Sequence, residues 1–477
     1  MAVKSAMEGK SGISAFQRIK LEGIVRRVLD DVKPTEDEMR RITAYSNELM
    51  GRLKSAAPKD VEIAFVGSAA RGTQIKGSYD MDIFLLFPKG LKEREMENKG
   101  LAIAKSIVNR GRGETFIIKY AEHPYLKLIV DSGTGLTADI VPAFKIENAR
   151  EIGTSVDRTQ LHNKFISARL TESEKDNVRV LKAFLKAHNI YGANAKYEGF
   201  SGYACELMVY QFGSFINVLQ EFSKLNLPLA LDPLNRETYR PHHERTGILA
   251  KKFKSRFVLI DPTDENRNVT AATSIESIAR LCITSRLMLK KPSIGFFYGP
   301  RHSDTYSSNR ISKLRKELGI DLYLVRFAVP NISEDIIWQQ LRRFSKRLSD
   351  MLEDNGFSTA LSVDSVSKEG AMAAFFISRM KKHYDIIEGP SSFMHVASDR
   401  FLDSHGNAIG TFFKDDRLVF IEESRFSDPE EVLRHAIKNE KSLPSYLDRK
   451  KVKIYANEIP EELAKPLYDS FIRKTSI

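Results

Sequence analysis

The sequence predicts a multidomain α+β protein, and three observations support that class. The chain has 477 residues, which is too long for one hydrophobic core and suggests about three domains. Hydrophobic residues make up 42% and charged residues 29%, a globular composition. The apolar pattern changes from mixed strands and helices to helical spacing near residue 168, and back to a mixture near residue 290. The expected domains are therefore 1–168, 169–290 and 291–477.

The first section alternates helices and strands. Apolar residues at helical spacing predict helices over 16–55, and Pro34 and Thr35 open the second of them. Shorter runs predict, in order, strands 61–66 and 83–87, helix 93–109, and strands 115–120, 125–130 and 136–141. The turn-forming residues 131–135 join the last two strands, which predicts a hairpin.

Two short polar motifs flank the second strand. Gly67 and Ser68 follow the first strand and form a turn whose amides and hydroxyl can face a phosphate. Asp80 and Asp82 open the second strand, where residues two apart project from one face about 6–7 Å from each other. Carboxylates so placed repel each other unless a cation lies between them, and Mg²⁺ prefers oxygen ligands together with substrate phosphates. The pair predicts a nucleotidyl-transfer site.

Each motif alone is common, and the ordinary alternatives are a surface turn and an exposed strand edge. Their order, spacing and apolar flanks favour function, because carboxylates at the start of a buried strand are costly without a partner. Asp139 strengthens this interpretation, since a lone Asp inside a strand is disfavoured. If its strand lies beside that of Asp80 and Asp82, Asp139 becomes a third carboxylate able to share a metal and orient an attacking hydroxyl.

The second section is mostly helical. Its first helix has an apolar face and a basic stripe, which consists of Lys175, Arg179, Lys182 and Lys186. A solvated surface and a functional one explain that stripe equally well. Gly192 ends this helix, Gly199–Tyr203 opens the next, and a polar loop at 259–269 precedes a helix from about Ser274 to Lys290.

The last section reads as a separate module. The pattern predicts strand 322–329, a helix from Ser333 to Gly356, and strands 359–363 and 373–378. Strands at 409–413 and 418–421 and a final helix after Pro429 complete it. Many RNA-binding modules share this β-α-β-β order, although fold analogy does not establish binding.

Charge and cysteine content narrow the setting. The net charge of +12 and the pI near 9.3 favour a polyanionic partner, and beside a phosphoryl-transfer site they point to nucleic acid. Cys205 and Cys282 have no cysteine or histidine partner at zinc spacing, which argues against a disulfide framework or a zinc site. No signal peptide or membrane-length apolar span is visible, so we expect a cytoplasmic protein without a membrane partner.

Three further motifs link the chain to a known family. With Gly67-Ser68 and Asp80-x-Asp82, the segments Val156–His162, Gly199–Tyr203 and Asp261–Thr263 resemble those of the archaeal-type (class I) CCA-adding enzymes. These are tRNA nucleotidyltransferases of the DNA polymerase β-like superfamily. The motifs cover about the first 290 residues, and the last third is similar in length and β-α-β-β order. The resemblance implies a polymerase β-like head with a mixed sheet, a helical neck, and a body and tail, the tail at about 316–398, that grip the upper half of tRNA.

The resemblance also implies residue roles. Asp80, Asp82 and Asp139 match the metal ligands, with Asp80 where the family often has Glu. The residues that match nucleotide-binding positions are Gly67, Ser68, Arg71, Thr159, His162, Lys182, Tyr191 and Arg267. Ser68 and Arg71 would contact phosphates, and Arg267 would lie near the incoming base. His162, Lys182 and Tyr191 would hold triphosphate and ribose, and Thr159 is a secondary candidate.

The implied activity is template-independent addition of C, C and A to the 3′ end of tRNA from CTP and ATP. The tRNA 3′-hydroxyl would attack the α-phosphate in line with two Mg²⁺ ions bound, and pyrophosphate would leave. Two alternatives stay open: a poly(A) or uridylyl transferase or oligoadenylate synthase with the same head, and a non-catalytic RNA-binding protein. The oligomeric state is open too, a homodimer being one option.

Overall fold

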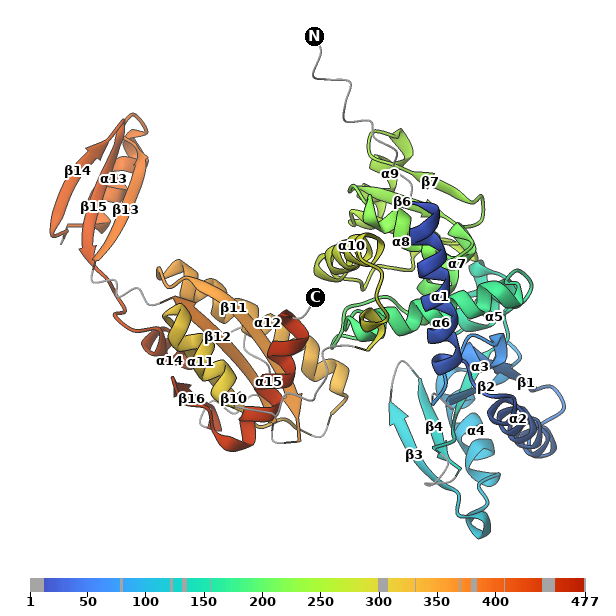
Figure 1. The fold of residues 1–477 in the computed structure, drawn as a ribbon. Helices are drawn as coiled ribbons and strands as arrows, with labels where there is room; N and C mark the ends of the chain where they lie inside the picture. Colours follow the sequence, from blue (N-terminus) through green and yellow to red (C-terminus); the bar gives the residue numbers. More distant parts are fainter. Residues whose placement is uncertain are drawn as a thin grey trace. The chain divides into compact units, whose positions relative to one another are not determined.

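The computed structural model describes residues 13–77, 80–120, 123–130, 135–154, 156–298, 308–330, 332–368, 370–378, 384–406, 408–439 and 451–475. These residues form two compact units that divide at residue 300 (Figure 1). Among them, no helix combines the length and the apolar character needed to cross a bilayer. The three-part division expected from the sequence stays a prediction.

A five-stranded mixed sheet, the head sheet, organises the start of the first unit. Its strand order is β1-β2-β5-β4-β3, and only β2 and β5 run parallel to each other. The strands are β1 (Glu62–Val66), β2 (Asp80–Phe87), β3 (Thr115–Tyr120), β4 (Pro124–Ile129) and β5 (Thr137–Phe144). Helices α2 (Glu36–Ala56) and α4 (Glu93–Ser106) join it in one hydrophobic core. The predicted mixed sheet with helices is confirmed; loop residues 131–134 lie outside the described part.

Strand register brings the predicted carboxylates together. Met81, Ile83 and Leu85 point into the core with the helices, so Asp80 and Asp82 project from the opposite face of β2. Asp82 pairs with Asp139 across the parallel strands β2 and β5. The expectation that the strand of Asp139 lies beside that of Asp80 and Asp82 is therefore confirmed.

Helices make up most of the rest of the first unit. They are α1 (Ala15–Val32), α3 (Gly67–Arg71), α5 (Arg158–Ser167), α6 (Glu172–Ala187), α7 (Gly202–Phe212), α8 (Phe215–Ser223), α9 (Glu244–Phe253) and α10 (Ile275–Lys290). Three short 3₁₀ helices are η1 (Arg110–Arg112), η2 (Ala149–Glu151) and η3 (Ile294–Phe297). The largest core cluster joins α1, α6, α7, α8 and α10, and it includes the fully buried rings of Phe184, Phe215 and Phe222. Figure 1 shows these helices in blue, green and yellow-green beside the head sheet.

The prediction of a loop at 259–269 is wrong. Strands β8 (Phe257–Asp261) and β9 (Asp264–Asn268) form a hairpin there, within a small sheet of order β7-β6-β8-β9 that also holds β6 (Leu229–Asp232) and β7 (Glu237–Tyr239). Every residue of β8 is buried, and the Asn268 side chain accepts a hydrogen bond from the Leu259 amide. The polar composition of β9 concealed this hairpin.

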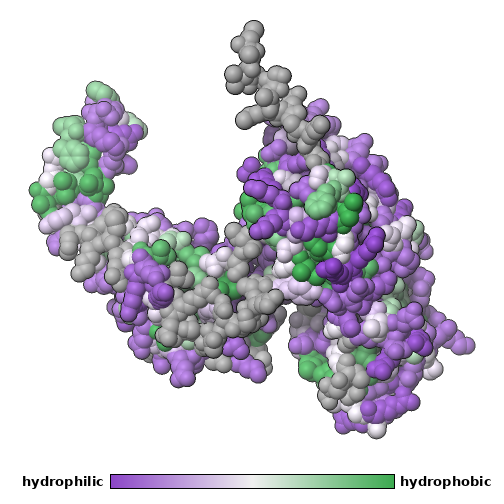
Figure 2. Space-filling view, in the orientation of Figure 1, coloured by the Kyte–Doolittle hydropathy of each residue, from purple (hydrophilic) through white to green (hydrophobic). Residues whose placement is uncertain are grey.

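The second unit contains two sheets. The larger has order β11-β12-β10-β16, and β10 (Ile320–Phe327), α12 (Glu334–Asp354), β11 (Thr359–Ser367) and β12 (Gly370–Ser378) confirm the predicted β-α-β-β order. The smaller has order β13-β15-β14. Its elements are β13 (Tyr384–Ser391), α13 (His395–Ser404), β14 (Gly410–Lys414) and β15 (Arg417–Glu423). Apolar residues gather on its surface in Figure 2. Its exposed apolar side chains include Ile386, Phe412 and Phe413.

The helix predicted after Pro429 is not the last element. After α14 (Pro429–Asn439), strand β16 (Lys453–Ala456) pairs with β10, and helix α15 (Glu461–Thr475) follows. Leu463 and Leu467 of α15 enter the same core as α11 (Ser308–Leu318), which the sequence did not predict either. Pro466 lies inside α15, and an internal proline normally argues against a helix.

His188, which caps α6, makes the stability of the first unit depend on pH. Its ring lies 4.6 Å from the ring of Phe184 and 5.9 Å from that of Phe296, measured between centroids. Burial lowers the pKa of His188 to about 4, with a smaller effect from the charge of Arg280. The unfolded chain therefore binds a proton here between pH 6.5 and 4 while the folded chain does not, which destabilises the fold by about 3 kcal/mol as pH falls through that window.

We expect His188→Gln to flatten the fall in melting temperature between pH 6.5 and pH 4. The matched control is His242→Gln, because His242 is exposed in the same unit. Parallel melting curves for His188→Gln and the wild type across this window would contradict the assignment.

Candidate active site

A cavity of about 500 Å³ in the first unit gathers most of the predicted site residues. The predicted residues among its lining are Gly67, Ser68, Arg71, Asp82, Asp139, Thr159, His162, Lys182 and Tyr191. Asp80 lies two residues before Asp82 on β2, and Arg267 lies on β9; neither is part of the lining. Further lining residues that were not predicted include His123, Tyr125 and Tyr203.

Gly67 lies where strand β1 turns into the five-residue helix α3. Its φ of +81° is in the left-handed region, and a Cβ atom placed on it would lie 1.9 Å from Asp82 Oδ2. A side chain at residue 67 would therefore displace the carboxylate of Asp82. The expected turn at Gly67-Ser68 is the first step of a helix, and it lies directly against the second predicted motif.

The three carboxylates differ in their surroundings. Burial and the neighbouring charge of Asp139 raise the pKa of Asp82 to about 7, and burial likewise raises the pKa of Asp139. Burial would also raise the pKa of Asp80, but hydrogen bonds from Thr137 and Lys127 outweigh it and leave that pKa below its usual value. Asp82 and Asp139 thus hold negative charge that the protein compensates poorly.

This donor set fits a divalent cation. Its ligand atoms are carboxylate oxygens, which Mg²⁺ prefers. Asp139 Oδ1 is buried and accepts no hydrogen bond among the described residues, although the Lys127 ammonium lies 3.5 Å away, and the carboxylate of Asp82 occupies the space that a Cβ on Gly67 would need. A cation would supply the compensation that the raised pKa values of Asp82 and Asp139 indicate is missing.

A second group of ligand-type side chains has a structural explanation. Within the described ranges, Glu93, Glu97 and His123 are the group of three whose possible ligand atoms lie within 4.8 Å of one another. His123 Nδ1 lies 2.9 Å from Glu97 Oε1, and Nε2 lies 3.1 Å from Thr154 Oγ1. Both ring nitrogens of this buried histidine are therefore satisfied, and the ring ties α4 to the start of β4.

Glu206 organises the part of the cavity formed by α3 and α6. It is fully buried on α7, and its Oε1 lies 3.0 Å from Arg71 Nε and also accepts a hydrogen bond from Thr73 Oγ1. Lys182 Nζ donates to the Thr73 carbonyl at 2.9 Å. Burial lowers the pKa of Lys182. Sequence reasoning missed Glu206, although a lone Glu in the apolar run Tyr203–Tyr210 was a usable signal.

The basic stripe of α6 is neither a fully solvated surface nor a fully functional one. Arg179 donates to the backbone carbonyls of Gln74 and Gly72, and Lys182 donates to that of Thr73. Both side chains are buried. The middle of the stripe therefore binds the loop that follows α3, and of its members only Lys182 also lines the cavity.

Asp261 links two residues that line the cavity, His162 and Tyr203, to β9 and the turn before it. Its carboxylate lies 2.8 Å from His162 Nε2 and accepts hydrogen bonds from Tyr203 Oη at 3.1 Å, Thr263 N at 2.9 Å and Arg267 Nη1 at 2.9 Å. Burial opposes the charge, but these bonds from His162 and Thr263 hold the pKa of Asp261 well below its usual range. The rings of His162 and Tyr203 stack at 3.8 Å. Arg267 and His162 are thus linked indirectly, because both bind the carboxylate of Asp261.

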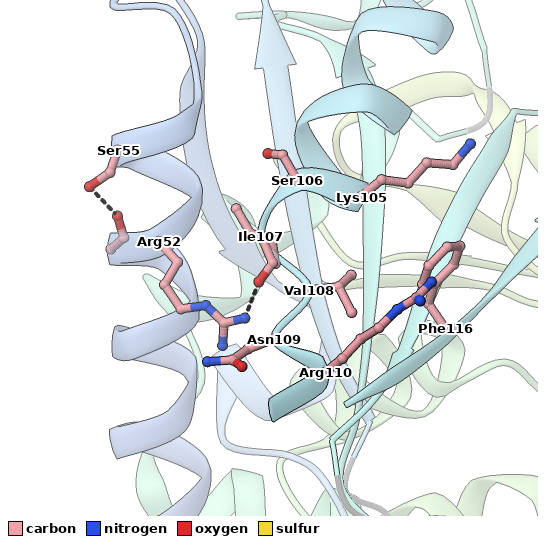
Figure 3. Close-up of a pocket in the computed structure, with 10 residues that line it drawn as sticks. Arg52, Ser55, Lys105, Ser106, Ile107, Val108, Asn109, Arg110 and Phe116 are labelled. Carbon is pink, nitrogen blue, oxygen red and sulfur yellow. Dashed lines mark hydrogen bonds between the residues drawn. The ribbon is translucent and has the colours of Figure 1, made fainter. Parts of the chain in front are cut away.

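A second hollow, of about 860 Å³, lies between the C-terminal ends of α2 and α4 (Figure 3). Its lining shares no residue with that of the first cavity. Arg52 donates to the Ile107 carbonyl, as Figure 3 shows, and lies 2.8 Å from the buried carboxylate of Glu114. Although burial opposes it, the hydrogen bond from Arg52 lowers the pKa of Glu114 to about 2. The charge of Arg52 is therefore already compensated.

Three family models match successive parts of the chain. Residues 46–162 match a nucleotidyltransferase domain, and residues 176–298 match the second domain of tRNA nucleotidyltransferase. Residues 319–455 match the C-terminal domain of the CCA-adding enzyme. Among solved structures, Cid1, described by its RNA terminal uridylyl transferase activity, has a TM-score of 0.46 at 16% identity and covers 59% of this chain and 98% of its own. At that TM-score the likeness supports no argument.

Several curated relatives match over most of their length. The CCA-adding enzyme of Archaeoglobus fulgidus is 34% identical over 87% of this chain and 89% of its own. That of Methanocaldococcus jannaschii is 32% identical, with coverages of 91% and 96%, and that of Sulfurisphaera tokodaii is 31% identical, with coverages of 95% and 98%. The chain therefore belongs to the family of CCA-adding enzymes, and its activity is that of a tRNA nucleotidyltransferase that adds CCA to the 3′ end of tRNA.

Proposed function

We propose that the cavity beside Asp82 and Asp139 is where the 3′ end of tRNA meets CTP or ATP. The observation that carries this is the placement of two poorly compensated carboxylates, on the parallel strands β2 and β5, against the turn at Gly67. A fold that only bound RNA would gain nothing from this arrangement, because the buried like charges cost stability.

Asp80, Asp82 and Asp139 are the residues that would hold Mg²⁺. When bound, Mg²⁺ would neutralise charge on the triphosphate and make the 3′-hydroxyl a better nucleophile. The hydroxyl gives up its proton to a carboxylate of the cluster and its oxygen forms a bond to the α-phosphorus of the incoming nucleotide. The bond between the α-phosphorus and the oxygen bridging to the β-phosphorus breaks, and pyrophosphate leaves. The carboxylates must be ionised for this role, so Asp82 must lose the proton that its environment favours.

The remaining cavity residues would hold the nucleotide. Arg71 and Lys182 carry positive charge at the wall formed by α3 and α6, which suits the triphosphate, and Ser68 adds a hydroxyl. His162, which binds Asp261, and Tyr191, whose hydroxyl lies near Gly202 together with the Lys182 ammonium, supply rings for ribose and base. Arg267, expected near the base, would act from behind His162 through Asp261. The match of residues 319–455 to the C-terminal domain of the CCA-adding enzyme supports a tRNA grip by the second unit.

A glycine pair tests the cavity directly. Gly67→Ala should abolish most activity, because the new Cβ would collide with Asp82 Oδ2. Gly77→Ala is the matched control: Gly77 also has a positive φ, of +78°, but a Cβ there would meet nothing within 4 Å. Both variants therefore carry a similar backbone strain of about 1 kcal/mol.

The measurement is the rate of CMP and AMP incorporation into tRNA that lacks its CCA end, with melting temperature as the check on folding. We expect a loss of about 10²-fold or more for Gly67→Ala only, at equal melting temperatures. Equal activities of the two variants would contradict the assignment of this cavity.

A further inference from the structure

Lys127 is a cation within the carboxylate cluster that the proposed reaction does not use. It lies on β4, where register pairs it with Asp139 of β5, and Asp139 in turn pairs with Asp82 of β2. The three side chains form one row across adjacent strands, on the face of the head sheet away from α2 and α4. No local pattern in the sequence distinguishes this lysine from other strand lysines.

The Lys127 ammonium bridges two of the three carboxylates. Its Nζ lies 3.0 Å from Asp80 Oδ1 and 3.5 Å from Asp139 Oδ1. The Lys127 and Asp139 side chains are 27% and 21% exposed, so their pair is screened less than pairs at the open surface, whereas Asp80 is 57% exposed and its pair with Lys127 is screened more. Thr137 also donates to Asp80 Oδ1, which fixes the carboxylate that the lysine reaches most closely.

The charge balance shows what this lysine does. When all three carboxylates are ionised, as metal binding requires, they carry a formal charge of −3, and the Lys127 ammonium reduces it to −2. The single positive charge of Lys127 offsets part of the repulsion between the carboxylates. Because its side chain is flexible, the ammonium can move away. A divalent cation placed on the same oxygens brings twice the charge and would be repelled by an ammonium left in place.

We infer that Lys127 is the resident counter-ion of the carboxylate cluster, which holds Asp80 and Asp139 in place without metal and gives up these contacts when a divalent cation binds. This inference rests on the proposed function, in which these carboxylates bind Mg²⁺. Lys127 is then a positioning residue. It stabilises the metal-free protein, and it sets the cation concentration at which the site fills, because each cation must displace it.

The test compares Lys127→Met with Lys145→Met in the full-length, nucleotide-free protein. Methionine keeps the length of the stem and removes the charge. Lys145 is a matched control, since it pairs with Glu62 at 2.8 Å in the same region but is 54% exposed and away from the cluster. Binding of Mn²⁺ is followed by electron paramagnetic resonance, with Mg²⁺ as competitor, and melting temperature is measured in EDTA and in Mg²⁺.

We expect Lys127→Met to bind Mn²⁺ at least fivefold more tightly than the wild type, to melt at a lower temperature in EDTA, and to gain more from Mg²⁺. Lys145→Met should match the wild type in all three. Unchanged or weaker Mn²⁺ binding by Lys127→Met would overturn the inference. Asp139→Asn distinguishes a failure of the proposed function from a failure of the role of Lys127. If Asp139→Asn still binds Mn²⁺, the proposed function itself is contradicted. If Asp139→Asn loses Mn²⁺ binding but Lys127→Met binds Mn²⁺ as the wild type does, only the role of Lys127 is contradicted.

Discussion

Asp139→Asn is expected to lower nucleotide incorporation by about 10³-fold or more while tRNA binding persists. The amide keeps the shape of the side chain but removes a charge that the proposed reaction requires. Asp82→Asn should have the same effect, because the two residues face each other across β2 and β5. Single-turnover incorporation measures the loss, and a gel-shift titration with tRNA measures binding. The exposed Asp37→Asn, on α2, is the control.

Although Asp82→Asn should lose activity, we do not expect it to lose stability. Burial and the charge of Asp139 raise the pKa of Asp82 to about 7, so its ionisation costs stability as pH rises from about 4 to 7. Asp82→Asn removes that cost and should melt at or above the wild-type temperature in EDTA at pH 7.5. A variant that loses both activity and fold would contradict a purely functional role for this carboxylate.

Glu206→Gln is expected to have the second-largest effect, on stability and nucleotide binding together. It removes the partner of Arg71 in a buried ion pair, and breaking such a pair costs about 3–5 kcal/mol of unfolding free energy. Arg71 also lines the cavity, so its looser position should raise the KM for CTP and ATP by about tenfold. Urea denaturation and steady-state kinetics measure the two effects.

Glu221→Gln is the control for the buried pair. Glu221 pairs with Arg240 at 2.6 Å in the same unit, but both side chains are solvent-accessible, so its loss should cost no more than about 1 kcal/mol. If Glu206→Gln matches Glu221→Gln in stability and leaves KM unchanged, Glu206 does not hold Arg71 in its working position.

The sequence was most informative where strand periodicity and chemistry coincided. The strands of the head sheet have clear apolar alternation, and the cost of an unexplained carboxylate in a strand marked Asp139 before any pairing was known. The structure pairs β2 with β5 in parallel and places Asp82 opposite Asp139; the sequence predicted that these strands could be neighbours but not their direction. Local signals were enough here because each residue type was unfavourable in its element without a partner.

The misses come from interactions between residues distant in sequence. Nothing local to Glu206 or Lys127 names Arg71, Asp80 or Asp139 as partners, since these pairs form only when separate elements fold together. The hairpin of β8 and β9 was hidden by the polar residues of β9, and α15 by its internal proline. In both, tertiary packing outweighed the local preference of the segment.

We expect one carboxylate cluster to catalyse the addition of all three nucleotides, C, C and A, to the 3′ end of tRNA. The most direct measurement incubates wild type and Asp139→Asn with tRNA lacking its CCA end, using CTP and ATP singly and together with Mg²⁺, and sequences the products. We expect C and C from CTP alone, CCA followed by arrest from the mixture, and no extension by Asp139→Asn. Homopolymer tails from the wild type, or normal CCA synthesis by Asp139→Asn, would contradict this expectation.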